Sequence, residues 1–357
     1  MVTLIRLADS ATYQHHRQVV ERLRFAGLPV REHGPHLLSV TVQVAGDARE
    51  PADVLANHPQ VAEVTHLSVD HPQVASEAVP EHNSTVTVGT TVIGANGFVV
   101  IAGPCAVESR DQMLTTCHAV SDAGAHILRG GLYKPRTSPY GFQGMGQSGF
   151  SLADEARAET GLPLITEIVD VRDIDDLGDH VDMVQVGARN MQNFALLREL
   201  GRSRIPVLLK RGLAATIDEV LLAAEYLLDG GNDQVVLCER GIRTYERAYR
   251  FTLDITAVPV LQERTHLPVI VDPSHAAGAT RWVEPLALAA AAVGADGILV
   301  ETHCDPAAAL CDGKQALRTE ALPGLIERLA VATSAAGRTM LPQPERMSAT
   351  QVAAAAG

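Results

Sequence analysis

The chain has 357 residues, of which 46% are hydrophobic and 20% charged, and its formal net charge at pH 7 is -13. This length suits one large domain of about 250 residues and a smaller one. The acidic balance argues against nucleic acid or an anionic membrane as partner, because both attract basic surfaces. No apolar segment reaches the roughly 18 residues that a membrane helix needs, and no signal-type apolar core follows the N-terminus, so we expect a cytoplasmic protein.

Residues 1–72 predict a small α+β domain. Short apolar segments indicate a strand, a helix, two strands, a helix and a strand, over residues 2–7, 12–25, 29–34, 36–44, 51–58 and 61–69. This βαββαβ order is typical of the ferredoxin-like motif. In residues 73–84, prolines and glutamates break any apolar period, and we expect a linker there.

A β-hairpin is predicted over residues 85–98, with Asn96-Gly97 as the turn signal. We expect this hairpin to plug the N-terminal end of the domain that follows it. At the other end of the chain, residues 335–357 are rich in Ala, Pro, Ser and Gln and show no apolar period. We expect this tail to be disordered or loosely packed.

Eight short apolar runs follow one another between about Val99 and His303: VVIAG, HILRGG, LPLITE, MVQVG, PVLLK, QVVLCE, PVIVD and GILVE. Continuous apolar runs are typical of parallel strands that are buried on both faces, and the helical stretches between them supply the crossovers. Eight such units predict a (β/α)8 TIM barrel over residues 85–334. The active site of this fold lies at the C-terminal ends of the strands. Nearly every run stops there at a charged or metal-capable residue, which predicts an enzyme.

Four possible metal ligands follow the first, seventh and eighth runs: Cys105, His275, Glu301 and Asp312. Those strands are neighbours in a closed barrel, so the four side chains can converge. One thiolate, one imidazole and two carboxylates suit one divalent ion of the Mn, Fe, Co or Zn class without selecting among them. For each residue alone, a structural role is the stronger interpretation, with the cysteine packed in the core and the carboxylates solvated. Four such residues at one end of the barrel favour the metal site.

Basic residues also gather at or after the strand ends of this acidic chain: Arg129, Lys134, Arg136, Arg189, Lys210, Arg211, Arg240 and Arg243. Arginine binds phosphate and carboxylate through two parallel hydrogen bonds, and lysine adds a compact charge. We therefore expect a small ligand that carries several negative charges, including more than one phosphate. One or two of the eight should instead pair with Glu108, Glu167 or Glu239 as barrel-top structure.

The five cysteines are odd in number and lack the paired spacing of a disulfide framework. We expect most of them to be reduced and buried. Cys311 directly precedes Asp312. If its sulfur lies near Cys105, oxidation would remove a metal-binding thiolate.

Seven segments resemble 3-deoxy-D-arabino-heptulosonate 7-phosphate (DAHP) synthase: IAGPCAVES, LRGGLYKPRTSPYGFQG, QVGARNMQNF, LLKRG, LCERGIRTYE, VDPSHAAG and CDGKQAL. The resemblance covers the barrel from Thr85 to Leu317, and it fits the short type-I branch that carries an N-terminal ferredoxin-like regulatory domain. The related 3-deoxy-D-manno-octulosonate 8-phosphate synthases usually show KANRS where this chain has KPRTS, and they usually lack the leading domain.

This resemblance implies that the enzyme condenses phosphoenolpyruvate with erythrose 4-phosphate, the first step of the shikimate pathway. It also implies a homotetramer and an aromatic amino acid effector that binds the leading domain. Three alternatives remain: condensation with another aldose phosphate, a DAHP synthase of a secondary pathway, and a ligand-sensing barrel without activity. The last would require the loss of a metal ligand or of the arginine pair, and none is missing.

The resemblance further implies a role for each matching site residue. Those implied to hold the metal are Cys105, His275, Glu301 and Asp312. Those implied at the phosphoenolpyruvate carboxylate and bridging oxygen are Arg129, Lys134 and Lys210; at its phosphate, Arg189 and Arg240; and at the aldose phosphate, Arg136 and Thr137. Asp272 would orient a metal ligand or a sugar hydroxyl. Lys134 is either the proton donor, with a pKa lowered by neighbouring cations, or only a carboxylate anchor.

Overall fold

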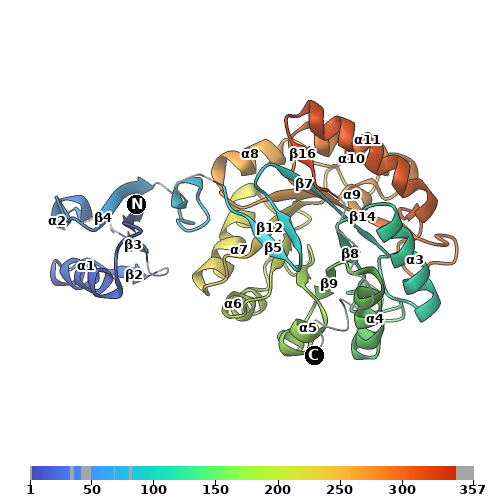
Figure 1. The fold of residues 1–357 in the computed structure, drawn as a ribbon, viewed down its shortest axis with the longest axis horizontal. Coiled ribbons are helices and arrows are strands. Elements are labelled where there is room, and N and C mark those ends of the chain that lie inside the picture. Colours follow the sequence, from blue (N-terminus) through green and yellow to red (C-terminus); the bar gives the residue numbers. More distant parts are fainter. Residues whose placement is uncertain (1, 33–35, 42–49, 68, 80–82, 343–357) are drawn as a thin grey trace.

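The computed structural model describes residues 2–32, 36–41, 50–67, 69–79 and 83–342. Figure 1 shows a barrel surrounded by helices and, beside it, a smaller unit formed by the start of the chain. Among the described helices, none combines the length and the apolar character needed to cross a bilayer.

The smaller unit is an antiparallel sheet with two helices. Its elements are β1 (Val2–Leu7), α1 (Tyr13–Phe25), β2 (Val30–Glu32), β3 (Leu37–Thr41), α2 (Pro51–Val54) and β4 (Val61–Leu67). The strand order in the sheet is β2-β3-β1-β4. This arrangement matches the predicted βαββαβ order, although α2 is shorter than expected. Ile5, Leu23 and Leu38 are fully buried between the sheet and the helices.

The barrel consists of eight parallel strands in chain order, and pairing of β14 with β7 closes it. The strands are β7 (Gly97–Gly103), β8 (Ile127–Arg129), β9 (Leu164–Ile168), β10 (Met183–Val186), β11 (Val207–Lys210), β12 (Val235–Glu239), β13 (Val269–Val271) and β14 (Gly297–His303). The (β/α)8 prediction is therefore confirmed. Each strand lies within or next to one of the eight apolar runs.

The helices that surround the barrel are α3 (Arg110–Asp122), α4 (Phe150–Thr160), α5 (Ile174–His180), α6 (Phe194–Arg202), α7 (Ile217–Asp229), α8 (Ala257–Arg264), α10 (Thr280–Ala292) and α11 (Leu322–Ala335). A short helix, α9 (Pro273–Ala277), and a short strand, β15 (Leu317–Arg318), lie at the barrel mouth, and four 3-10 turns span Ser76–Ala78, Gly146–Gly149, Val171–Asp173 and Thr319–Ala321. The long loops after β8 and β12 contain no α-helix before α4 and α8.

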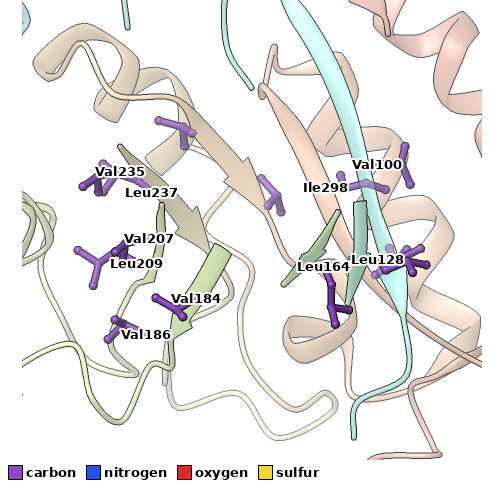
Figure 2. Packing of buried hydrophobic residues seen from close by; sticks show 14 of the residues in the cluster. Val100, Leu128, Leu164, Val184, Val186, Val207, Leu209, Val235, Leu237 and Ile298 are labelled. Carbon is purple, nitrogen blue, oxygen red and sulfur yellow. The ribbon is translucent and has the colours of Figure 1, made fainter. Parts of the chain in front are cut away.

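Both faces of the barrel strands are apolar. Val207 and Leu209 of β11 pack with the helices, whereas Leu208 between them belongs to the cluster inside the barrel. Figure 2 shows Val184 and Val186 of β10, with Val207 and Leu209, in the outer layer. Burial on both sides explains why the sequence shows continuous apolar runs instead of an alternation.

A hairpin closes the N-terminal end of the barrel. Its strands are β5 (Val86–Val88) and β6 (Thr91–Ile93), and Val86, Val88 and Ile93 pack in the cluster inside the barrel. The hairpin forms where the sequence predicts a plug, but the turn at Asn96-Gly97 leads from β6 into β7 and is not the hairpin turn. The hairpin turns at Gly89, whose φ of 55° suits a two-residue connection, and Asn96 lies between β6 and β7.

The chain after α11 is better ordered at its start than its composition predicts. Strand β16 (Thr339–Met340) pairs with β7, and Arg338 donates a 2.7 Å hydrogen bond to the buried carboxylate of Asp296. Backbone pairing of this kind needs no apolar period, so the sequence pattern does not reveal it. The rest of the predicted tail, residues 343–357, lies outside the described residues.

Candidate active site

Four side chains with metal-ligand chemistry meet at the C-terminal end of the barrel: Cys105, His275, Glu301 and Asp312. We call them the ligand cluster. One donor atom from each lies within 4.8 Å of all the others. Cys105 follows β7, His275 lies on α9, Glu301 is in β14 and Asp312 follows β14. The closed barrel brings together residues that are up to 207 positions apart.

His275 is held in a fixed orientation by Asp272, the N-cap residue of α9. One Asp272 oxygen accepts the backbone N–H of His275 at 2.9 Å, and the other lies 2.7 Å from its Nδ1. The second ring nitrogen, Nε2, therefore faces the cluster, 3.3 Å from Oε1 of Glu301. A carboxylate behind a histidine is the usual support of a metal-binding imidazole.

The charge state of the cluster suits a cation. Burial lowers the pKa of His275 despite the nearby Asp272, which favours the neutral ring that binds metals. Although burial opposes it, the neighbouring basic groups of His275, Arg129 and Lys134 hold the pKa of Glu301 well below its ordinary value. Burial raises the pKa of the Cys105 thiol. A metal that binds the cysteine would therefore displace a proton from it.

The loop that carries Asp312 is tightly constrained. Asp312 has a φ of 52°, in the left-handed region, and a Cβ added to Gly313 would lie 2.2 Å from the carbonyl oxygen of Pro306. Glu108, from the loop after β7, accepts the backbone N–H of Leu310 at 2.9 Å. The sulfur of Cys311 lies 2.9 Å from that of Cys105, so the proximity on which the oxidation hypothesis depends is present.

Beside the ligand cluster lies a cavity of about 320 Å³, which we call the anion cavity. His275 and Asp312 form part of its wall. Its basic and hydroxyl-bearing wall residues are Lys134, Arg136, Thr137, Ser138, Arg189, Lys210, Arg240 and Arg250. Within the described residues, no carboxylate forms an ion pair with Arg136, Arg189 or Arg240. Arg240 is only 4% exposed, and a buried charge without a carboxylate partner is costly unless a ligand neutralises it.

Other basic residues of the predicted set are already paired. Arg129 donates to Oε1 of Glu301 at 2.7 Å and lies outside the cavity wall. Arg211 bonds Glu239 and Asp254, each at 2.8 Å, which confirms that some of the eight belong to the barrel-top structure. Arg243 is exposed and is also absent from the wall. Lys210 donates to Asp272 at 2.5 Å.

The environment of Lys134 corrects one expectation. Burial by itself would lower the pKa of this lysine, but the neighbouring acidic groups of Cys105, Glu167 and Glu301 raise it above its ordinary value. The cations near Lys134 in the sequence predict a lowered pKa, but the carboxylates that reverse this direction come from other strands, β9 and β14. Glu167 Oε2 lies 3.6 Å from Nζ of Lys134. Lys134 is therefore a charged group at neutral pH.

Several wall residues have no signal in the sequence. Arg250 and Phe251 come from the long loop after β12, which has neither an apolar run nor a strand end to set their register. The ring of Phe251 lies under the guanidinium of Arg240, 4.4 Å from its carbon. Gln185 points into the cavity from β10, where a buried polar residue inside an apolar run is the only hint.

The barrel and the domain before it are similar to known proteins. Residues 73–334 match the model of the DAHP synthetase I family. A phospho-2-dehydro-3-deoxyheptonate aldolase from Thermotoga maritima is 44% identical over 83% of this chain and 88% of its own length. A 2-dehydro-3-deoxyphosphooctonate aldolase from Syntrophobacter fumaroxidans is 32% identical over 68% of this chain and 89% of its own length.

Solved structures agree as well. The crystal structure of the Thermotoga maritima DAHP synthase superposes with a TM-score of 0.75 at 40% identity, covering 95% of this chain and 99% of that one. A truncated form of that enzyme gives a TM-score of 0.71 at 43% identity over 76% of this chain and 99% of that one. The chain therefore belongs to the DAHP synthetase I family of enzymes, whose reaction opens the shikimate pathway to the aromatic amino acids.

Proposed function

We propose that this chain condenses phosphoenolpyruvate with D-erythrose 4-phosphate and water to give DAHP and phosphate, with one divalent metal ion in the ligand cluster. The observation that carries the proposal is the anion cavity, in which cations without carboxylate partners face that cluster. Two phosphates and a carboxylate would neutralise these cations. Membership of the DAHP synthetase I family supports the same reaction.

Arg189 and Arg240 are our proposed clamp for the phosphate of phosphoenolpyruvate. Both belong to the cavity wall, and both lack an ion pair among the described residues. Phe251 covers one face of the planar guanidinium of Arg240 and leaves the N–H groups at its edge for the phosphate. Arg136 and Thr137, on the loop after β8, are the proposed site of the aldose phosphate.

The carboxylate and bridging oxygen of phosphoenolpyruvate are assigned to Arg129, Lys134 and Lys210. All three are buried, and each already touches a carboxylate: Glu301, Glu167 and Asp272 respectively. Lys134 and Lys210 line the anion cavity, and we infer that the substrate carboxylate joins their pairs as an additional acceptor; Arg129 lies outside the cavity wall, and its contact with the substrate rests on the family resemblance alone. Holding the enol ether over the aldehyde in this way removes much of the barrier through positioning.

The ligand cluster fits a divalent cation of the Mn, Fe, Co or Zn class. Its donor atoms converge, its histidine is oriented from behind, and its thiol is buried beside two carboxylates. Such a mixed soft and hard set does not select one of these metals. When bound, the ion would polarise the erythrose aldehyde as a Lewis acid. Asp272 orients His275 for this purpose.

Lys134 is our candidate for moving a proton to the bridging oxygen. As C3 of phosphoenolpyruvate attacks the aldehyde, C2 becomes electron-poor, water adds to it, and the C–O bond to phosphate then breaks. The raised pKa of Lys134 keeps this side chain an ammonium until that transfer. A pure carboxylate anchor has the same charge, so the two roles differ in one observable: a proton donor alters the pH profile of kcat when it is replaced by arginine.

We also propose an assignment of the chain to parts: residues 1–72 as a regulatory domain, 73–84 as a linker and 85–334 as the catalytic barrel. The linker is anchored at its start, because Glu225 on α7 accepts the backbone N–H groups of Gln73 and Val74 at 3.0 to 3.2 Å, and Val74 is fully buried against the barrel. An aromatic amino acid as effector and a homotetramer complete the proposal.

A phosphate-release assay tests the reaction. Phosphoenolpyruvate is offered with erythrose 4-phosphate, arabinose 5-phosphate and unphosphorylated aldoses, each with and without a chelator. Among these aldoses, we expect only erythrose 4-phosphate to cause phosphate release from phosphoenolpyruvate. The chelator should stop this release, and an added divalent metal should restore it. Preference for arabinose 5-phosphate would favour the octulosonate reaction named for the Syntrophobacter fumaroxidans relative. Full activity in the chelator would refute the metal assignment.

A further inference from the structure

Glu301 is completely buried, and both of its carboxylate oxygens accept hydrogen bonds from outside the ligand cluster. Oε1 accepts from Arg129 at 2.7 Å. Oε2 accepts from Nε2 of Gln315 at 2.5 Å. Oε1 also faces Nε2 of His275. The direction in which this carboxylate presents its lone pairs is therefore set by two donors, one of which is an uncharged amide.

The Gln315 amide is itself held in one orientation. Its side chain is buried, at 2% exposed, and its Oε1 accepts from Nη1 of Arg250 at 2.6 Å. A guanidinium can only donate, so the oxygen of the amide must face Arg250 and its NH₂ group must face Glu301. The hydrogen bond from Arg250 therefore fixes the orientation in which the amide of Gln315 contacts Glu301.

Arg250 connects this amide to a second member of the cluster. Its Nη1 lies 3.6 Å from Oδ1 of Asp312, on the same loop as Gln315. The side chain packs against Gly278, where an added Cβ would lie 2.4 Å from Cβ of Arg250. Arg250, on the loop after β12, therefore contacts both the end of α9 and the loop after β14.

We propose that Arg250 and Gln315 are positioning residues that act as one relay, which orients Glu301 and Asp312 and thereby sets the affinity of the ligand cluster for its metal. The proposal rests on the metal site of the proposed function and extends it to two residues that touch no metal. Partners of this kind typically change metal affinity by about 10- to 100-fold when they are removed.

Gln315→Met preserves the length of the side chain but removes both hydrogen bonds. We expect it to weaken metal binding by about 10- to 100-fold. Gln315→Glu retains an acceptor for Arg250 but places a second carboxylate against Glu301, and it should weaken binding as well. Arg250→Met should act in the same direction. If the two residues form one relay, the fold-loss of metal affinity in the double variant should be smaller than the product of the fold-losses in the two single variants.

The test uses the full chain, stripped of metal and titrated with Co²⁺ in competition with a chelator. The absorption band from the Cys105 thiolate to cobalt reports binding at the cluster, and Cys105→Ser should lack it. Gln262→Met is the matched control, because Gln262 on α8 bonds the carbonyl of Gly294, at 2.7 Å, and the side chain of Asp296, and both partners precede β14, at the end of the barrel opposite the ligand cluster. It should bind cobalt within twofold of the unchanged chain.

Circular dichroism of each metal-free variant reports whether it folds. If Gln315→Met does not fold, Arg250→Met tests the same relay, because the side chain of Arg250 is partly exposed and its replacement disturbs the core less. The inference would be overturned, and the proposed function left intact, if folded Gln315→Met and Arg250→Met bound cobalt as tightly as Gln262→Met does. Fully multiplicative losses would overturn the relay. Absence of a Cys105-dependent band in the unchanged chain would instead overturn the metal site, and this inference with it.

Discussion

Replacing Gly187 by alanine should reduce activity while the barrel stays folded. Gly187 follows β10, and a Cβ at this position would lie 2.0 Å from Oε1 of Glu167. Ordinary contact begins near 3.4 Å, so the carboxylate must retreat by about 1.4 Å, the difference between the two distances. Glu167 lies 3.6 Å from the Lys134 ammonium, and this retreat would disturb that pair.

The magnitude follows from the size of this displacement. A misplacement of about 1 Å in a catalytic arrangement can cost about 100-fold in rate, and we expect a loss of that order in kcat/KM. The atom that moves is the end of a flexible side chain, so overpacking should cost only about 1–3 kcal/mol of unfolding free energy. The assay is phosphate release at saturating metal, with thermal unfolding measured in parallel.

Two comparisons make the result decisive. Gly324→Ala on α11 is the control, since its Cβ would lie 3.4 Å from the flexible end of Arg328, and it should retain full activity. In a Glu167→Ala background there is no carboxylate to displace, so adding Gly187→Ala should cost little further activity. A second 100-fold loss in that background, or near-normal activity of Gly187→Ala alone, would refute the reasoning.

Four further outcomes are expected. Cys105→Ser should leave the fold intact but abolish metal-dependent turnover, because a hydroxyl is a poor ligand for these ions; turnover that survives would remove the cysteine from the site. Arg136→Ala should raise the KM for erythrose 4-phosphate far more than that for phosphoenolpyruvate, and Arg240→Ala should do the reverse, whereas equal losses would mean that the two phosphate pockets are misassigned. Deleting residues 1–72 should leave an active barrel that aromatic amino acids do not inhibit, while at least one of them inhibits the full chain; identical titration curves would rule out a regulatory role. A disulfide-forming oxidant such as diamide should lower metal binding reversibly in the unchanged chain, because the two sulfurs lie 2.9 Å apart, and Cys311→Ser should resist it, which thiol titration can check.

The sequence by itself determines the barrel and the register of its site. Runs such as VLLK at 207–210 are apolar on both faces, and eight of them separated by helical stretches are typical of strands covered on both sides. Nearly every run also ends in a polar residue at the mouth of the barrel, where a polar side chain can reach a ligand or another polar group. Cys105, His275 and Glu301 could be predicted as neighbours for this reason, since closure of eight parallel strands dictates which strand ends meet.

Only the tertiary structure decides features that depend on distances between segments without a period. The hairpin turns at Gly89, where a positive φ of 55° allows a two-residue connection between β5 and β6, although Asn96-Gly97 is the stronger turn signal in the sequence. The pKa of Lys134 rises because carboxylates from other strands surround it, and a list of nearby residues in the chain does not give their distances. Arg250 meets Gln315 across 65 positions of irregular loop. Periodicity fixes which face of a strand is buried, but a loop has no period, and its contacts exist only once the whole chain has folded.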